Sequence, residues 1–297
     1  MVLKKKNLEP HAFMLPSYIL LFGFMGYPLI NCIRLAFTNY KIMKPDEVYF
    51  AGLNNFKEIL SDSDLLMILG NSVKFVVITV FLQFVLGLIL ALALKKPFRF
   101  RGVYQGIVFL PWAFSGFIIG LTFQWLFNGE YGPINDLLLK AHLITEKISF
   151  TGTPGLSLFT VITALTWAGI PFFAIMILAA LQSIPNELYE AAKIDGGNAL
   201  DRFRHVTIPC IKPTIVITIL LRTIWVFNNA DLIYVMTKGG PANTSHTLSS
   251  YMFMKAYSTL DFGQASALGV LFMFILVLYV LLFFKITRFN DEAGDVG

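Results

Sequence analysis

The twenty residues from Phe75 to Leu94, FVVITVFLQFVLGLILALAL, contain one strongly polar side chain, that of Gln83. A helix of about 20 apolar residues is long enough to cross the hydrocarbon core of a bilayer. A second run, Gly269–Phe284, contains no strongly polar residue. The two runs together predict a protein that crosses a membrane more than once.

The composition of the whole chain agrees with this interpretation. Of its 297 residues 14% are charged, 56% are hydrophobic and 15% are aromatic, which is unusual for a soluble protein. The net charge is +5. In a chain with several spans such an excess normally reports orientation, so we expect no nucleic-acid partner.

The apolar runs predict an all-α membrane protein, because a spanning backbone must satisfy its own hydrogen bonds. Six transmembrane helices account for them, at about Pro16–Phe37, Ser72–Leu94, Val103–Phe127, Leu156–Leu181, Thr214–Met236 and Ala265–Ile286. The predicted organisation is an N-terminal tail (1–15), a six-span domain (16–288) and a C-terminal tail (289–297).

The basic residues predict the orientation of these spans. The N-terminal tail, the 95–101 loop, the 182–212 loop and the C-terminal end hold thirteen of the 23 Lys and Arg residues, whereas the other three loops hold seven. Loops rich in Lys and Arg face the cytoplasm. Both termini are therefore expected in the cytoplasm.

The 182–212 loop carries helix signals of its own. Pro185 suits a first helical turn, and Gly196-Gly197 stops a helix. Asn198 then caps a second short helix that is expected to end at Pro209. The loop is thus predicted to form a cytoplasmic helix-turn-helix.

Within this loop the chain reads Glu190-Ala191-Ala192-Lys193-Ile194-Asp195-Gly196-Gly197, followed by Val206-Thr207-Ile208-Pro209. This resembles the EAA loop of ABC importer membrane subunits, with Gly197 where Ala is common. Three further motifs are similar to the carbohydrate-uptake branch of that family, the MalF-like permeases for maltose or glycerol phosphate: Gly52–Phe56, Ala180–Pro185 and Thr237–Pro241 with Thr244. The resemblance covers about residues 15–290.

The resemblance implies the type I ABC importer fold and a set of partners. These are a second homologous permease in a heterodimer, two ATPase subunits that bind ATP and Mg, an extracytoplasmic solute-binding protein, and the lipid bilayer of a bacterial or archaeal cell membrane. The sequence contains no G-x-x-x-x-G-K-[ST] motif. We therefore expect no cofactor and no enzymatic activity in this chain.

The resemblance also assigns residues to two tasks. Coupling to the ATPase falls to Glu190, Ala191, Ala192, Asp195 and Gly196, although Glu190 could merely favour the N-terminus of its own helix. The substrate path, which the resemblance places on the third, fourth and fifth spans, comprises Trp112, Ser115, Gly116, Gly169, Phe172, Arg222, Trp225 and Asn229.

The fifth span supports this path on physical grounds. Arg222 lies nine residues beyond Pro213, about 14 Å along a helix and close to the bilayer midplane. Trp225, Val226 and Asn229 share its helical face. A cation at this depth needs an anion or water. The resemblance implies a carbohydrate cargo, in particular an oligosaccharide, and Arg222 adds the expectation that this cargo is acidic, unless the second permease supplies the anion.

Other interpretations stay open at this stage. The aromatic residues of the path could be ordinary packing, its two glycines could only permit close helix contact, and Asn229 could bond across helices. The cargo could be glycerol-3-phosphate or another non-sugar solute. A secondary transporter would be expected to show inverted repeats or paired carboxylates, and an enzyme or metal site would need a cluster that the scattered His11, His142, His205 and His246 do not form.

Overall fold

The computed structural model describes residues 9–287. The predicted C-terminal tail (289–297) and the first eight residues of the predicted N-terminal tail lie outside the described residues. These described residues form two compact units, one containing residues 9–65 and 252–274 and the other residues 66–251 and 275–287.

The first unit contains the N-terminal helices and a small hairpin. Its elements are α2 (Glu9–Leu21), the π-helical η1 (Phe22–Gly26), α3 (Tyr27–Ala36), β1 (Thr38–Asn39), η2 (Pro45–Glu47), β2 (Tyr49–Phe50) and α4 (Asn54–Leu60). Strand β1 pairs with β2 in antiparallel register, Thr38 opposite Phe50. The first span starts before the predicted Pro16, because this proline lies inside α2.

The second unit contains most of the helical bundle. Its elements are α6 (Arg101–Phe109), η3 (Leu110–Ala113), α7 (Gly116–Leu126), α8 (Pro133–Lys140), α9 (Leu156–Gln182), α10 (Asn186–Ile194), α11 (Ala199–Arg202), the π-helical η4 (Phe203–Thr207), α12 (Ile208–Phe227) and α13 (Asp231–Met236). Three helices belong partly to each unit: α5 (Leu65–Lys95), α14 (Leu248–Tyr257) and α15 (Phe262–Thr287).

The prediction of an all-α membrane protein is confirmed. Among the described residues, five helical stretches are long and apolar enough to cross a membrane: Phe13–Ala36, Leu65–Lys95, Leu156–Gln182, Ala199–Phe227 and Phe262–Thr287. A sixth span exists only if a bent pair, Arg101–Ala113 with Gly116–Leu126, is taken as one.

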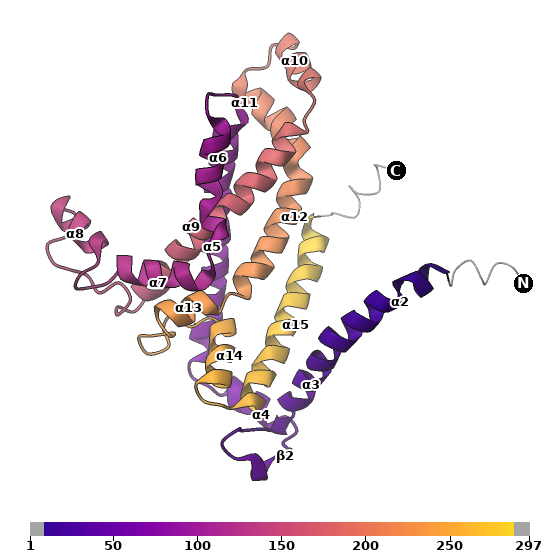
Figure 1. Cartoon of the computed structure of the whole chain (residues 1–297), viewed down its shortest axis with the longest axis vertical. Helices are drawn as coiled ribbons and strands as arrows, with labels where there is room; N and C mark the ends of the chain where they lie inside the picture. Colours follow the sequence, from indigo (N-terminus) through magenta and orange to yellow (C-terminus); the bar gives the residue numbers. More distant parts are fainter. Residues whose placement is uncertain (1–8, 288–297) are drawn as a thin grey trace, which may run out of the picture. The chain divides into compact units, whose positions relative to one another are not determined.

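The predicted third span, Val103–Phe127, is sharply bent in the structure. Helices α6 and α7 meet at 93°, and α7 lies across the direction of α9 and α12 (Figure 1). Phe114 and Ser115 adopt extended backbone angles, and the Ser115 hydroxyl then caps α7 by accepting from the Ile118 N–H at 3.3 Å. Apolar residues flank Ser115 on both sides, so the sequence carries no clear signal that a new helix begins there.

The predicted ends of the fifth span are wrong. The second short helix of the 182–212 loop, predicted to end at Pro209, runs on into this span, because Pro209 lies in the first turn of α12, where its missing N–H costs little. Helix α12 begins at Ile208, before the predicted Thr214. It ends at Phe227 and not at Met236, because Asn228 and Asn229 interrupt it before Asp231 begins α13. Asn side chains compete with helical hydrogen bonds.

Two of the sequence motifs build connections within single units. The buried Asn55 donates from Nδ2 to the carbonyls of Ala36 and Thr38, at 2.9 and 3.0 Å. In the second unit Asn71 of α5 donates to the Thr244 carbonyl at 2.9 Å and so holds the 237–247 loop. These contacts give both motifs a structural role.

Candidate functional site

Arg222 lies on α12 in the second unit, with only 8% of its surface exposed. Its Nε donates to Oε1 of Gln83 on α5 at 2.6 Å. Gln83 is fully buried, and its Nε2 donates to the Leu165 carbonyl of α9 at 2.6 Å. A short chain of hydrogen bonds therefore joins three helices of the bundle.

Gly169 of α9 makes room for this arrangement. A Cβ atom at this position would lie 2.2 Å from Nη2 of Arg222 and 2.2 Å from Nε2 of Gln83. Both distances are far below van der Waals contact, so any larger residue would displace one of the two side chains. The predicted path residue Gly169 thus lies directly against Arg222.

Gln83 is the member of this cluster that sequence reasoning missed. Its signal was present, because a lone amide in an otherwise apolar span is costly unless it is hydrogen-bonded. The sequence did not reveal its partner, which is 139 residues away.

Three aromatic residues extend the cluster from Arg222. The ring of Phe172, on α9, lies 6.2 Å from that of Trp112 and 5.1 Å from that of Trp225, and Cζ of Arg222 lies 5.8 Å from the Phe172 centroid. Phe172 is buried, whereas Trp112 and Trp225 are 54% and 48% exposed. Two half-exposed indoles thus lie next to one buried ring.

The other predicted path residues lie at helix ends. Ser115 caps α7 and Gly116 is its first residue, where a Cβ would lie 3.8 Å from Oδ2 of Asp231. Asn229 follows the end of α12, so its predicted place on the helical stripe of Arg222 is wrong. Its Oδ1 is buried and accepts no hydrogen bond from the described residues.

The charge of Arg222 is not neutralised by the part of the chain that the structure describes. No carboxylate of residues 9–287 forms an ion pair with it, and its hydrogen-bond partner Gln83 is neutral. An anion that pairs with Arg222 would therefore come from outside these residues.

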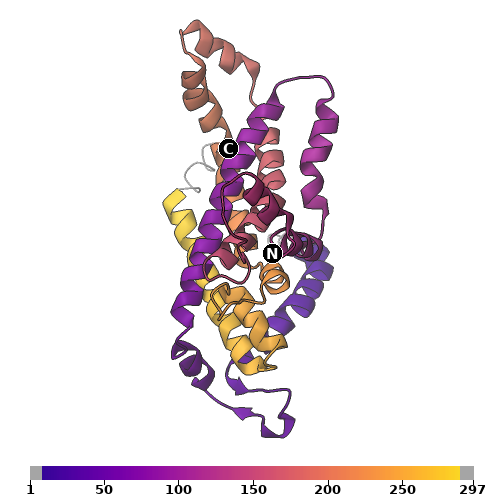
Figure 2. The ribbon, with the colours of Figure 1, turned by 90° about the vertical axis from the view of Figure 1, so that its left-hand side faces the viewer.

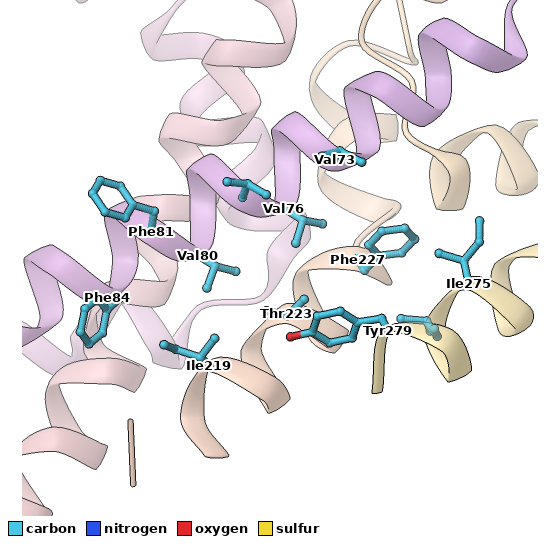
Figure 3. A pocket seen from close by; sticks show the side chains of 12 residues that line it. Val73, Val76, Val80, Phe81, Phe84, Ile219, Thr223, Phe227, Ile275 and Tyr279 are labelled. Carbon is cyan, nitrogen blue, oxygen red and sulfur yellow. The ribbon is translucent and has the colours of Figure 1, made fainter. Parts of the chain in front are cut away.

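A cavity elsewhere in the second unit is too apolar to bind a sugar. Residues of α5, α12 and α15 line a cavity of about 460 Å³ (Figure 3). Its lining includes Val76, Val80 and Ile219, and only Thr223 and Tyr279 contribute hydroxyls. A sugar would find too few hydrogen-bonding groups there.

The 182–212 loop forms the predicted hairpin at the opposite end of the unit from α7 and α13 (Figure 1), and Figure 2 shows it projecting beyond the bundle. Helix α10 begins after Pro185 and ends before Asp195. Gly196 follows with φ +83°, which favours glycine. Asn198 and Asp201 form a reciprocal capping box on α11. The predicted helix and both of its boundaries are confirmed.

The surface of α10 is accessible along most of its length. Glu190 and Ala191 are exposed, Ala192 is half-buried, and Ile194 is 86% exposed. Glu187, not Glu190, lies in the first turn of α10. Stabilisation by the helix dipole fades beyond the first turn. The alternative role of Glu190, at its own helix N-terminus, is therefore weakened.

Metal-ligating side chains do not cluster in the described part of the chain. Within residues 9–287 no group of three or more His, Cys, Asp or Glu side chains is close enough to hold a metal ion.

Comparison with known proteins gives consistent relatives. Residues 83–291 match the family described as binding-protein-dependent transport system inner membrane component. The trehalose/maltose transport system permease MalF of Thermococcus litoralis is 32% identical over 95% of this chain and 94% of its own length. The sulfoquinovosyl glycerol transport system permease SmoG of Agrobacterium fabrum is 33% identical over 93% of this chain and 89% of its own length.

Solved structures agree on the fold. A chain from a bacterial ABC transporter involved in the import of the acidic polysaccharide alginate superimposes with a TM-score of 0.81, at 23% identity, over 96% of both chains.

Proposed function

The chain belongs to the family of binding-protein-dependent ABC importer permeases, and we propose that its cargo is a carbohydrate, most simply an oligosaccharide. As a permease subunit it is not itself an ATPase, and its importer's ATP is bound by partner ATPase subunits. The observation that carries the proposal is the pair of half-exposed indoles, Trp112 and Trp225, which both lie next to the ring of Phe172. Indole faces stack on the apolar faces of sugar rings.

The relatives support the same class of cargo. The two permeases that are 32% and 33% identical are named for a trehalose/maltose system and a sulfoquinovosyl glycerol system. Both names contain sugars, one neutral and one bearing a sulfonate. The class of cargo therefore has more support than its charge.

Arg222 supports an acidic cargo. A buried guanidinium without a carboxylate partner in the described residues is costly, and a carboxylate on the cargo would offset that cost while the sugar passes. The competing source of the anion is the second permease, with which this chain is proposed to form a heterodimer.

The assembly proposed here also contains two ATPase subunits and an extracytoplasmic binding protein. The chain's two termini and the α10–α11 hairpin lie in the cytoplasm, in keeping with the excess of Lys and Arg at that side. Helix α10 docks on the ATPase through Glu190 and the small residues Ala191 and Ala192.

Uptake measurements with single-tryptophan variants test the class of cargo. Trp112→Ala and Trp225→Ala should each lower carbohydrate uptake by about fivefold, which corresponds to the loss of one stacking contact of about 1 kcal/mol. Trp125→Ala is the matched control, because Trp125 is equally exposed but contacts none of the cluster's rings. Equal losses in all three variants would contradict the proposal.

Arg222 variants test the charge of the cargo. Arg222→Gln should reduce uptake of an acidic oligosaccharide much more than that of a neutral one of equal length. The bond from Arg222 Nε to Gln83 is lost for both cargoes, so a structural defect affects them equally. Equal loss of both would assign Arg222 to the architecture of the bundle or to the second permease.

A further inference from the structure

A basic cavity lies where the end of α5 meets the α10–α11 hairpin, within the second unit. It has a volume of about 540 Å³. Lys95 and Lys96 contribute from the end of α5, and Arg202 contributes from α11. Leu92 and Phe203 line its apolar part. Cations from two segments about a hundred residues apart in the sequence thus converge on one space.

The wall of this cavity is held in place by hydrogen bonds. Nζ of Lys95 donates to Oη of Tyr189 at 2.8 Å and lies 4.2 Å from the centre of the Tyr189 ring. Oη of Tyr189 is in turn 3.0 Å from Oγ1 of Thr207. These contacts connect α5, the proposed coupling helix α10 and η4, so an occupant of the cavity would touch the connection between a span and the coupling hairpin.

The cations retain capacity to bind an anion. Arg202 uses Nη1 to donate to the Gly197 carbonyl at 2.9 Å, which leaves its other N–H groups. Lys95 uses one of its N–H groups on Tyr189. Within residues 9–287 neither they nor Lys96 form an ion pair with a carboxylate. Orientation rules explain why these residues share a side of the membrane, but they do not require a common cavity.

We propose that this cavity binds a phosphate-type anion, namely the headgroup of an anionic phospholipid, and that the lipid holds the hairpin against α5. An amphipathic lining favours a lipid over free phosphate, because Leu92 and Phe203 can contact the glycerol and upper acyl region while the cations contact the phosphate. The position fits as well, since Lys95 is the last residue of a spanning helix. The inference rests on the proposed cytoplasmic position of the hairpin.

Native mass spectrometry of the purified importer complex tests the site directly. With phosphatidylglycerol and phosphatidylcholine as probes, the complex should retain phosphatidylglycerol preferentially. Lys96→Gln should weaken that retention about fivefold, and Lys96→Gln with Arg202→Gln about 30-fold, from about 1 kcal/mol per basic residue. Lys285→Gln is the control, because Lys285 is an exposed cation in the last turn of another span. Excess inorganic phosphate should compete poorly.

Three outcomes would overturn the proposal. They are undiminished lipid retention in the double variant, equal retention of both lipids, and complete displacement by inorganic phosphate, which would indicate a free-anion site. Loss of ATPase subunits from the double variant with unchanged lipid retention would assign the cavity to subunit docking. Because lipid retention is measured without cargo, its result is independent of whether the carbohydrate proposal holds.

The functional consequence is measured in vesicles. ATP hydrolysis stimulated by loaded binding protein should be higher in phosphatidylcholine with phosphatidylglycerol than in phosphatidylcholine alone, and the double variant should lose most of that difference. The Lys285→Gln variant should keep it. An undiminished difference in the double variant would show that the lipid acts elsewhere.

Discussion

The cluster around Arg222 and the α10–α11 hairpin are built in opposite ways. In the cluster, Gln83, Leu165 and Arg222 meet from three helices, with partners 82 and 139 residues apart. In the hairpin, Asn198 bonds to the backbone of Leu200 and Asp201, two and three residues away. A change in the cluster should therefore be felt across the bundle, whereas a change in the hairpin should stay local unless it touches the proposed ATPase contact.

The largest effect is expected at Glu190, where the hairpin is proposed to contact the ATPase. Glu190→Lys should abolish transport while the spans still insert, because it replaces the proposed attraction to a basic groove of the ATPase by a repulsion. The measurements are uptake and the recovery of ATPase subunits with the purified complex.

Glu187→Lys on the same helix is the matched control. It loses the favourable charge in the first turn of α10, worth about 0.3–1 kcal/mol. It should therefore only weaken the helix. If both variants behaved alike, the hairpin would be sensitive to charge in general and Glu190 would lose its assignment to docking.

Gly169→Ala should also have a large effect, on the cluster. The added methyl group would overlap Arg222 Nη2 and Gln83 Nε2, so we expect a loss of about 1–3 kcal/mol of stability and a matching fall in the unfolding temperature of the complex. Gly70→Ala in α5 is the control, because a Cβ there meets nothing within 4 Å. Equal stability of the two variants would mean that the central glycine is not required for close packing.

The sequence predicted the locally built hairpin better than the cluster, whose contacts are long-range. The hairpin was predicted to within a residue at Pro185 and Asn198, since capping and turn signals act over a few positions. The bend before α7 and the end of α12 were not predicted, because apolar residues on both sides conceal a change of direction. The set of path residues was assigned from family resemblance, and the residue that bonds Arg222, Gln83, was absent from it.

A double-mutant cycle on Gln83 and Arg222 measures how much stability the cluster gains from one long-range contact. Gln83→Leu should cost about 1.5–3 kcal/mol, because it leaves a buried cation without its hydrogen-bond partner. Adding Arg222→Met removes that cation and should restore part of the stability. Thermal unfolding of the complex gives the coupling energy. Simple additivity of the two changes would show that the 2.6 Å contact contributes no specific stability.

The smallest expected effect concerns Gly196, where the hairpin turns. Its φ of +83° lies in the region that costs a non-glycine residue about 1–2 kcal/mol, and a β-branched side chain suffers most. Gly196→Val should therefore loosen residues 186–202, seen as faster hydrogen exchange there, while exchange in α9 stays unchanged. Gly196→Asn should be milder, since Asn tolerates positive φ. No Cβ clash contributes, because a Cβ at 196 meets nothing within 4 Å. If Gly196→Val instead altered exchange around Gln83 and Arg222, the hairpin and the cluster would form one cooperative structure, and the contrast between local and long-range construction would fail.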